Sequence, residues 1–191
     1  MKKEEIISYN DRIGKSLENM RITDKSGNKH SDLSEIIDTI KSARGQKKLI
    51  FIGNGGSAAI AAHYAQDFTK IGKIRSKNFN DPQLISMVVN DFSRDEMFSK
   101  PIEWHADEGD VLIAISSSGQ SNNILNGAKA AQLKKCKVIT LSSFEPNNPL
   151  SSLGDYNIYV AASKPDYGIA ESAHSVLLHA ILDQIAKENF A

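Results

Sequence analysis

Apolar residues recur at two different spacings along the chain, and the spacing changes near residue 45. Before that point they lie three and four positions apart, which predicts an amphipathic helix carrying Ile6, Tyr9, Ile13, Leu17 and Met20. After a polar loop over residues 23–30, Ser31 is the expected N-cap of a second helix, whose apolar residues are Leu33, Ile36, Ile37 and Ile40. The apolar faces of this helix pair must cover the sheet that follows or pair with another subunit.

Five apolar runs follow from residue 48, and each is continuous rather than alternating, as in parallel strands buried on both faces. We expect strands over residues 48–53, 84–89, 110–116, 137–142 and 156–161. Helical patterns begin near Ser57, Asp95 and Asn122, and a last helix covers about residues 170–188. This alternation predicts an α/β fold, a three-layer, flavodoxin-like, doubly wound sheet of about five parallel strands. We expect one domain over residues 1–191, with a helical extension (1–45) and an α/β core (46–191).

Charge and cysteine content narrow the class of protein. Lys+Arg and Asp+Glu are both 23, so no global field favours nucleic acid or an anionic membrane. The single cysteine, Cys136, cannot form an internal disulfide, and its place before an apolar run predicts a buried structural thiol. The N-terminus is charged where a signal peptide is apolar, and no apolar run approaches the ~18 residues of a membrane span. We expect a soluble, cytoplasmic protein.

The segment GNGGSA follows the first of these strands and opens a helix at Ser57. Glycines let the backbone approach a ligand, and a helix N-terminus attracts phosphate or carboxylate. Gly53, Gly55 and Ala58 also fit a dinucleotide fingerprint loosely. That interpretation requires an acidic residue about 20 residues further on, and Asp91 lies far beyond this spacing. A phosphate-binding lysine after the glycines is absent too.

A second loop, ISSSGQSNN, follows another expected strand and enters a helix near Asn122. Hydroxyls and amides gathered at a helix N-terminus can surround a phosphate with neutral donors. A serine-rich turn with one capping serine accounts for only one or two of the four hydroxyls, those of Ser116, Ser117, Ser118 and Ser121. A serine nucleophile is disfavoured because the G-x-S-x-G pattern is missing. The loop therefore favours binding of a phosphosugar.

Histidines and acids gather on two helices. His63 and Asp67 share a helix face, although such a pair is by itself more often a surface contact than a metal site. The last helix adds Glu171 and His179, and the four side chains make a ligand set suited to zinc. On one straight helix, however, Glu171 and His179 lie ~12 Å apart. Either Glu171 precedes the helix or a subunit boundary intervenes. We expect ordinary roles for the remaining histidines, in the core for His174 and at the surface for His30 and His105.

Four segments together resemble one known family. The segments are GNGGSAAIAAHYAQD, NDF, ISSSGQS and ESAHSVLLH, in this order. In them the chain resembles the sugar isomerase (SIS) domain and, within that family, the phosphoheptose isomerases. The likeness covers nearly the whole chain, including the N-terminal helix pair that family members use in tetramer assembly. It implies an SIS-type fold, a homotetramer, and conversion of sedoheptulose 7-phosphate to D-glycero-D-manno-heptose 7-phosphate.

The resemblance also implies roles for individual residues. Ser116, Ser117, Ser118 and Ser121 would hold the phosphate; Asn54, Gly55, Ser57, Asp91 and Glu171 would contact the substrate; and His63, Asp67, Glu171 and His179 would surround a zinc ion. Asp67 and His179 would exchange protons with the substrate. The family usually has glutamate in place of Asp67 and glutamine in place of Glu171, so the base is one methylene shorter and the site gains a negative charge.

The expected chemistry is an aldose–ketose isomerisation through an enediolate, with Asp67 as base and His179 as its partner. Two alternatives remain open. One is a non-catalytic SIS protein that binds a partner; retention of His63, Asp67 and His179 favours an enzyme instead. The other is an enzyme or regulator acting on a different phosphosugar, such as arabinose 5-phosphate or a hexosamine phosphate.

Overall fold

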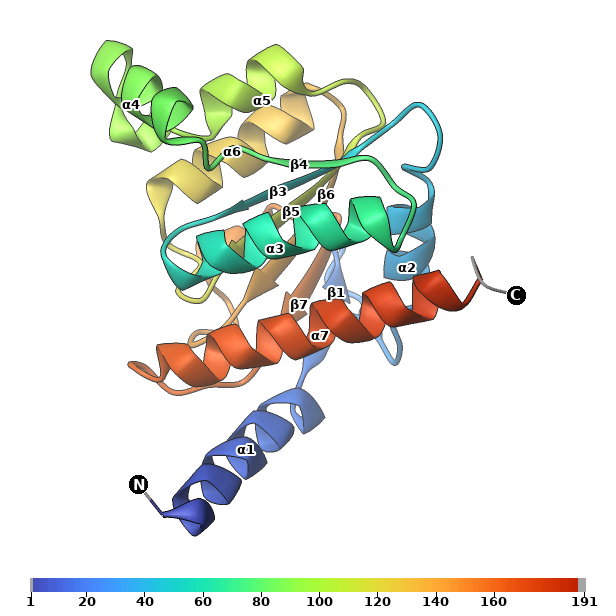
Figure 1. Ribbon diagram of the computed structural model, residues 1–191, viewed down its shortest axis with the longest axis vertical. Helices are drawn as coiled ribbons and strands as arrows, with labels where there is room; N and C mark the ends of the chain where they lie inside the picture. Colours follow the sequence, from blue (N-terminus) through green and yellow to red (C-terminus); the bar gives the residue numbers. More distant parts are fainter. Residues whose placement is uncertain (1, 189–191) are drawn as a thin grey trace.

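The structure is a computed structural model that describes residues 2–188. Within these residues the strands form a single sheet in the order β2-β1-β7-β6-β5-β3-β4 (Figure 1). Neighbouring strands from β4 to β7 are parallel. The short strand β1 pairs antiparallel with β7, and β2 pairs antiparallel with β1. The bounds are β1 Arg21–Asp24, β2 Lys29–His30, β3 Leu49–Gly53, β4 Ser76–Asn78, β5 Val111–Ser116, β6 Lys137–Ser142 and β7 Tyr156–Tyr159.

Helices cover both faces of this sheet, which confirms the three-layer, doubly wound fold. Side chains that alternate along β3 enter opposite cores, Phe51 on one face and Ile50 and Ile52 on the other. The Phe51 face packs against α2 (Ser34–Lys41), α3 (Gly56–Lys70) and α7 (Tyr167–Lys187). The opposite face packs against α5 (Ser99–His105) and α6 (Asn122–Leu133). Four of the five expected strands are confirmed, as β3, β5, β6 and β7.

The strand expected over residues 84–89 is wrong, because this segment lies in the helix α4 (Pro82–Asp91). Its partly or fully buried apolar residues are Leu84, Ile85 and Val88, a helical spacing, while Met87 and Val89 are exposed. The missing parallel strand is β4, a short polar edge strand. The helix expected near Asp95 is a 3-10 turn (Arg94–Glu96) followed by α5.

The N-terminal extension also differs from the prediction. The segment expected as a polar loop is part of the β1–β2 hairpin, which begins at Arg21. The helix α2 begins at Ser34 with Leu33 as its N-cap, not Ser31. Asp32 accepts a hydrogen bond from the Ser34 amide, which explains the later start. Ile36 and Ile40 of α2 are buried against the sheet. By contrast α1 (Lys3–Glu18) projects below α7 (Figure 1) and leaves Ile6, Ile7 and Tyr9 exposed.

Strand order places one crevice at the carboxyl ends of β3 and β5. From β3 the chain first adds β4 on one side and then β5 on the other, so the direction of winding reverses between β3 and β5. Ligands of doubly wound sheets bind at such a switch point. Both loops singled out in the sequence, after β3 and after β5, begin here.

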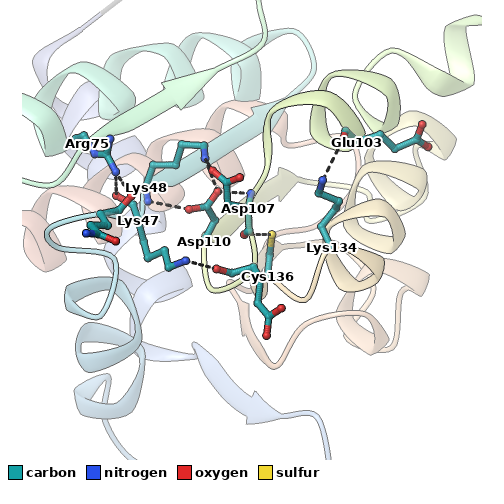
Figure 2. Close-up of polar contacts among 10 residues, drawn as sticks. Lys47, Lys48, Arg75, Glu103, Asp107, Asp110, Lys134 and Cys136 are labelled. Atoms are coloured by element: carbon teal, nitrogen blue, oxygen red, sulfur yellow. Dashed lines mark hydrogen bonds and ion pairs between the residues drawn. The ribbon is translucent and has the colours of Figure 1, made fainter.

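A network of polar contacts lies at the amino ends of β3 and β5, opposite the crevice (Figure 2). Asp110, fully buried before β5, lies 2.6 Å from the Lys48 ammonium and accepts bonds from the Lys48 and Asp107 amides. Cys136 is buried beside Asp107, and burial raises the pKa of its thiol to about 11. The prediction of a buried structural thiol is confirmed. No helix within residues 2–188 is long and apolar enough to cross a membrane.

Candidate functional site

The glycine loop and the serine loop are joined by a pair of side-chain amides. Asn54 of the glycine loop and Asn123 of α6 exchange two hydrogen bonds, each 2.9 Å long. The Asn123 oxygen also accepts a bond from the Ile124 amide. This reciprocal pair fixes the distance between the N-termini of α3 and α6, so both helix ends face one crevice. Sequence reasoning missed Asn123, because its partner lies 69 residues away.

A cavity of about 130 Å³ lies between these loops. It is lined by Asn54, Ser57, Ile115, Ser116, Ser117, Ser118, Ser121, Tyr167 and Glu171. The Ser117 hydroxyl is buried and has no hydrogen-bond partner among the residues described. Ser121 occupies the N-cap of α6 yet makes no side-chain capping bond. These two hydroxyls are therefore available to a ligand rather than used by the turn.

Glu171 lies close to the N-terminus of α3. A Cβ added at Gly56 would collide with the Glu171 carboxylate, so glycine is needed there for this approach. The partial positive charge of a helix N-terminus stabilises a carboxylate in this position. The carboxylate of Glu171 consequently forms the acidic side of a cavity whose other polar groups are neutral.

A second hollow of about 340 Å³ adjoins the cavity and shares Ser118, Ser121 and Tyr167 with it. Lys164, from the connection between β7 and α7, lines this hollow. The sequence analysis did not single out Lys164, which lies in neither the glycine loop nor the serine loop. Its position depends on the fold of the β7–α7 connection, for which the sequence offers no motif.

His63, Asp67 and His179 form a cluster on the neighbouring helices α3 and α7. One donor atom from each lies within 4.8 Å of the other two. The His63 Nε2 is 3.1 Å from the Asp67 carboxylate, and the ring centroids of His63 and His179 are 5.7 Å apart. Donors to a tetrahedral zinc ion are roughly 3–3.5 Å apart, because each lies about 2 Å from the ion. Small side-chain rotations would therefore let the cluster fit a divalent ion.

Glu171 is not part of this three-residue cluster. It lies within α7, so the possibility that it precedes the helix is excluded. Along that helix it is eight residues from His179, or about 12 Å. Within one chain, Glu171 faces the serine cavity while His179 faces His63 and Asp67.

Two expected substrate contacts lie outside the serine cavity. Gly55 is the N-cap of α3, with φ of +54°, and it is exposed. Asp91 is exposed at the end of α4, where its carboxylate accepts a 2.7 Å bond from Asn90. Asp91 is the last residue of α4, the helix that replaces the strand expected over residues 84–89.

The remaining histidines follow the sequence analysis in part. His174 is fully buried, its Nε2 lies 3.2 Å from the Ser142 carbonyl, and its Nδ1 has no partner among the described residues. Burial lowers the pKa of His174 to about 4, so this ring is a neutral core residue. His105 is exposed, as expected, and stacks on Phe79. His30 is half-buried and lies 3.5 Å from Asp24.

Comparison with known proteins agrees with this geometry. Residues 8–143 match the family model of the SIS domain. The chain is 35% identical over 149 residues to the phosphoheptose isomerase of Syntrophotalea carbinolica, covering 75% of this chain and 74% of that protein. It is 36% identical over 151 residues to the phosphoheptose isomerase of Edwardsiella ictaluri, covering 74% and 75% of the two chains.

Solved structures of this family share the fold. The phosphoheptose isomerase of Neisseria gonorrhoeae superposes with a TM-score of 0.72 at 29% identity, covering 80% of this chain and 84% of that one. The phosphoheptose isomerase of Francisella tularensis gives a TM-score of 0.76 over 98% of this chain and all of its own, at 21% identity, a likeness of fold alone. With the match over residues 8–143 and relatives at 35–36% identity, this chain belongs to the SIS domain family and, within it, to the phosphoheptose isomerases.

Proposed function

We propose that the chain interconverts sedoheptulose 7-phosphate and D-glycero-D-manno-heptose 7-phosphate. The observation that carries this proposal is the clustering of Asp67 and His179 beside His63, on helices whose neighbouring loops form a serine-lined cavity. The Ser117 hydroxyl, which has no partner in the part of the chain that the structure describes, and the two helix N-termini suit the phosphate. A carboxylate and an imidazole suit the proton transfers of an isomerase.

The chain's own side chains supply each proton transfer. The Asp67 carboxylate removes a proton from C1 of the open-chain ketose, and an enediolate forms as the C1–C2 double bond develops. Return of that proton to C2 gives the aldose, while His179 moves a proton from the C1 oxygen to the C2 oxygen. Protons and electrons balance, since substrate and product are isomers.

The metal is proposed as zinc, held by His63, Asp67 and His179 with Glu171 as a further ligand. A divalent ion at this place would polarise the carbonyl and stabilise the negative charge of the enediolate. Because Glu171 lies about 12 Å along α7 from His179, we propose that it comes from a second copy of the chain. The exposed Ile6, Ile7 and Tyr9 of α1 and Val176 of α7 offer apolar surface for such an assembly, proposed as a cytoplasmic homotetramer.

Incubation with sedoheptulose 7-phosphate tests the activity directly. Product formation is followed by ¹H NMR, with untreated, chelator-treated and zinc-restored protein compared at equal concentration. We expect turnover that falls on chelation and returns with zinc. Arabinose 5-phosphate in a parallel sample tests the alternative substrate. No product from either sugar, with zinc present, would instead favour a non-catalytic SIS protein that binds a partner.

A further inference from the structure

Tyr64 connects the core of the protein to the His/Asp/His cluster. Its side chain is fully buried in α3, and its hydroxyl reaches across to α7. There the hydroxyl oxygen lies 2.5 Å from the Ser175 carbonyl oxygen and 2.5 Å from Nδ1 of His179. The Ser175 hydroxyl is 3.0 Å from the same oxygen. Neither the sequence motifs nor the proposed proton transfers assign Tyr64 a role.

The single phenolic proton can occupy only one of these contacts. A carbonyl oxygen can only accept, and two oxygens 2.5 Å apart repel unless a proton lies between them. The Tyr64 proton is therefore donated to the Ser175 carbonyl. The lone pairs of the Tyr64 oxygen then accept from Nδ1–H of His179 and from the Ser175 hydroxyl, so every polar group in the network is satisfied.

We propose that Tyr64 is a positioning residue that holds His179, a member of the His/Asp/His cluster, as the Nδ1–H tautomer and so leaves the lone pair on Nε2, the nitrogen that Tyr64 does not contact. The other ring nitrogen of a working histidine is commonly fixed by a carboxylate, a carbonyl or water. Here the phenol relays the same constraint from a backbone carbonyl. The tautomer is a property of the chain itself, and its consequence for turnover rests on the proposed isomerase activity.

The opposite tautomer would disable His179 in two ways. If the phenol donated to Nδ1, the Tyr64 oxygen and the Ser175 carbonyl oxygen would face each other without a proton between them. The Nε2 atom would carry a proton instead of a lone pair, so it could neither accept a proton from substrate nor bind a metal ion. The hydrogen bond of Tyr64 thus selects the only neutral form of the ring that keeps an acceptor free of Tyr64.

¹⁵N NMR of the histidine rings measures the tautomer in the metal-free protein. The His179 signals are identified among the five histidines by their absence from a His179→Gln variant. We expect a protonated, pyrrole-type Nδ1 and an unprotonated Nε2. In Tyr64→Phe the Nε2–H tautomer gains population, zinc affinity measured by calorimetry falls about 10–100-fold, and kcat falls more than KM rises. The Ser175→Ala variant keeps the carbonyl, so it retains the wild-type tautomer.

Tyr159→Phe is the matched control. It also removes a hydroxyl from a buried tyrosine, one that donates to the Phe144 carbonyl at 3.2 Å, away from the cluster. We expect the wild-type tautomer and zinc affinity in this variant. An Nε2–H tautomer in the wild-type chain would overturn the proposal, and so would a folded Tyr64→Phe variant with unchanged tautomer and zinc affinity. If Tyr64→Phe does not fold, the wild-type spectrum and Ser175→Ala decide. Absence of isomerase activity would refute the proposed function but leave both measurements valid.

Discussion

Two aspartates in different regions, one at the amino ends of the parallel strands and one on the helix α3, are used in opposite ways. At the amino ends, the Asp110 carboxylate is fully buried and accepts from three donors, the Lys48 ammonium and the amides of Lys48 and Asp107. Near the C-terminal end of α3, Asp67 is partly exposed and lies 3.1 Å from His63, with His179 close by. One carboxylate is saturated by its own chain, and the other remains able to accept a proton or a metal ion.

The difference follows from what each region must do. A buried charge is costly unless its neighbours satisfy it, so a structural carboxylate is surrounded by donors. A group that acts on a ligand must keep part of its hydrogen-bonding capacity free until the ligand arrives. Residue type therefore indicates little about the role of a side chain. The share of its hydrogen-bonding positions that the protein itself occupies indicates more.

The largest effect is expected from Asp67→Asn. Removal of the carboxylate eliminates the proposed base, so kcat should fall by about 10²–10⁴-fold while the unfolding temperature changes little. Steady-state assays with sedoheptulose 7-phosphate, together with thermal unfolding, measure both quantities. Asp67→Glu keeps the carboxylate and should retain measurable turnover. Asp183→Asn, an exposed change one turn beyond His179, is the surface control. Normal activity in Asp67→Asn would remove this residue from the mechanism.

The same substitution at the buried Asp110 should have the reverse effect. In Asp110→Asn, an amide NH₂ must face a backbone N–H or the Lys48 ammonium, because both carboxylate oxygens accept bonds there. Loss of one partner of a buried ion pair destabilises by about 3 kcal/mol, or roughly 6–12 °C in unfolding temperature. The kcat of the folded fraction should stay normal. A variant as stable as the wild type but catalytically impaired would reverse our assignment of the two regions.

His174 extends the comparison along α7, since it is five residues from His179 but buried and neutral. Its pKa is lowered by burial from 6.5 to about 4. Between these values the unfolded chain binds a proton that the folded chain does not, so stability is lost as pH falls through this window. The loss is on the order of 3 kcal/mol. Urea unfolding from pH 7 to pH 4 should show a steeper decline for the wild type than for His174→Gln. Equal slopes would contradict this assignment.

The sequence predicted most of the fold because buried parallel strands leave an unambiguous apolar run. It failed where that signal is shared or missing. In α4 the run over residues 84–89 is also compatible with a helix, and only Val88 is fully buried. The edge strand β4 has no apolar residue and gave no signal. The β1–β2 hairpin is stabilised by pairing with β7, which is distant in sequence.

The candidate site was predictable where chemistry follows local spacing. His63 and Asp67 are one helical turn apart, and the glycine and serine loops each form continuous motifs. Contacts between distant segments were not predictable. The Asn54–Asn123 pair and the Tyr64–His179 contact span 69 and 115 residues and depend on how α3, α6 and α7 pack. Sequence motifs therefore named the reactive groups, while their positioning partners required the structure.

A pair of serines offers the finest test of the comparison. The Ser117 hydroxyl is buried and has no partner within residues 2–188, whereas the Ser143 hydroxyl donates a 2.7 Å bond to the Val160 carbonyl. Ser117→Ala should raise KM about tenfold, because a hydrogen bond to a charged phosphate contributes about 1.5 kcal/mol, and should leave stability unchanged. Ser143→Ala should lower the free energy of unfolding by about 1 kcal/mol with KM unchanged. If Ser117→Ala instead destabilised the chain without changing KM, its hydroxyl would belong with the structural groups, because truncating an unpaired group removes no bond from the folded protein.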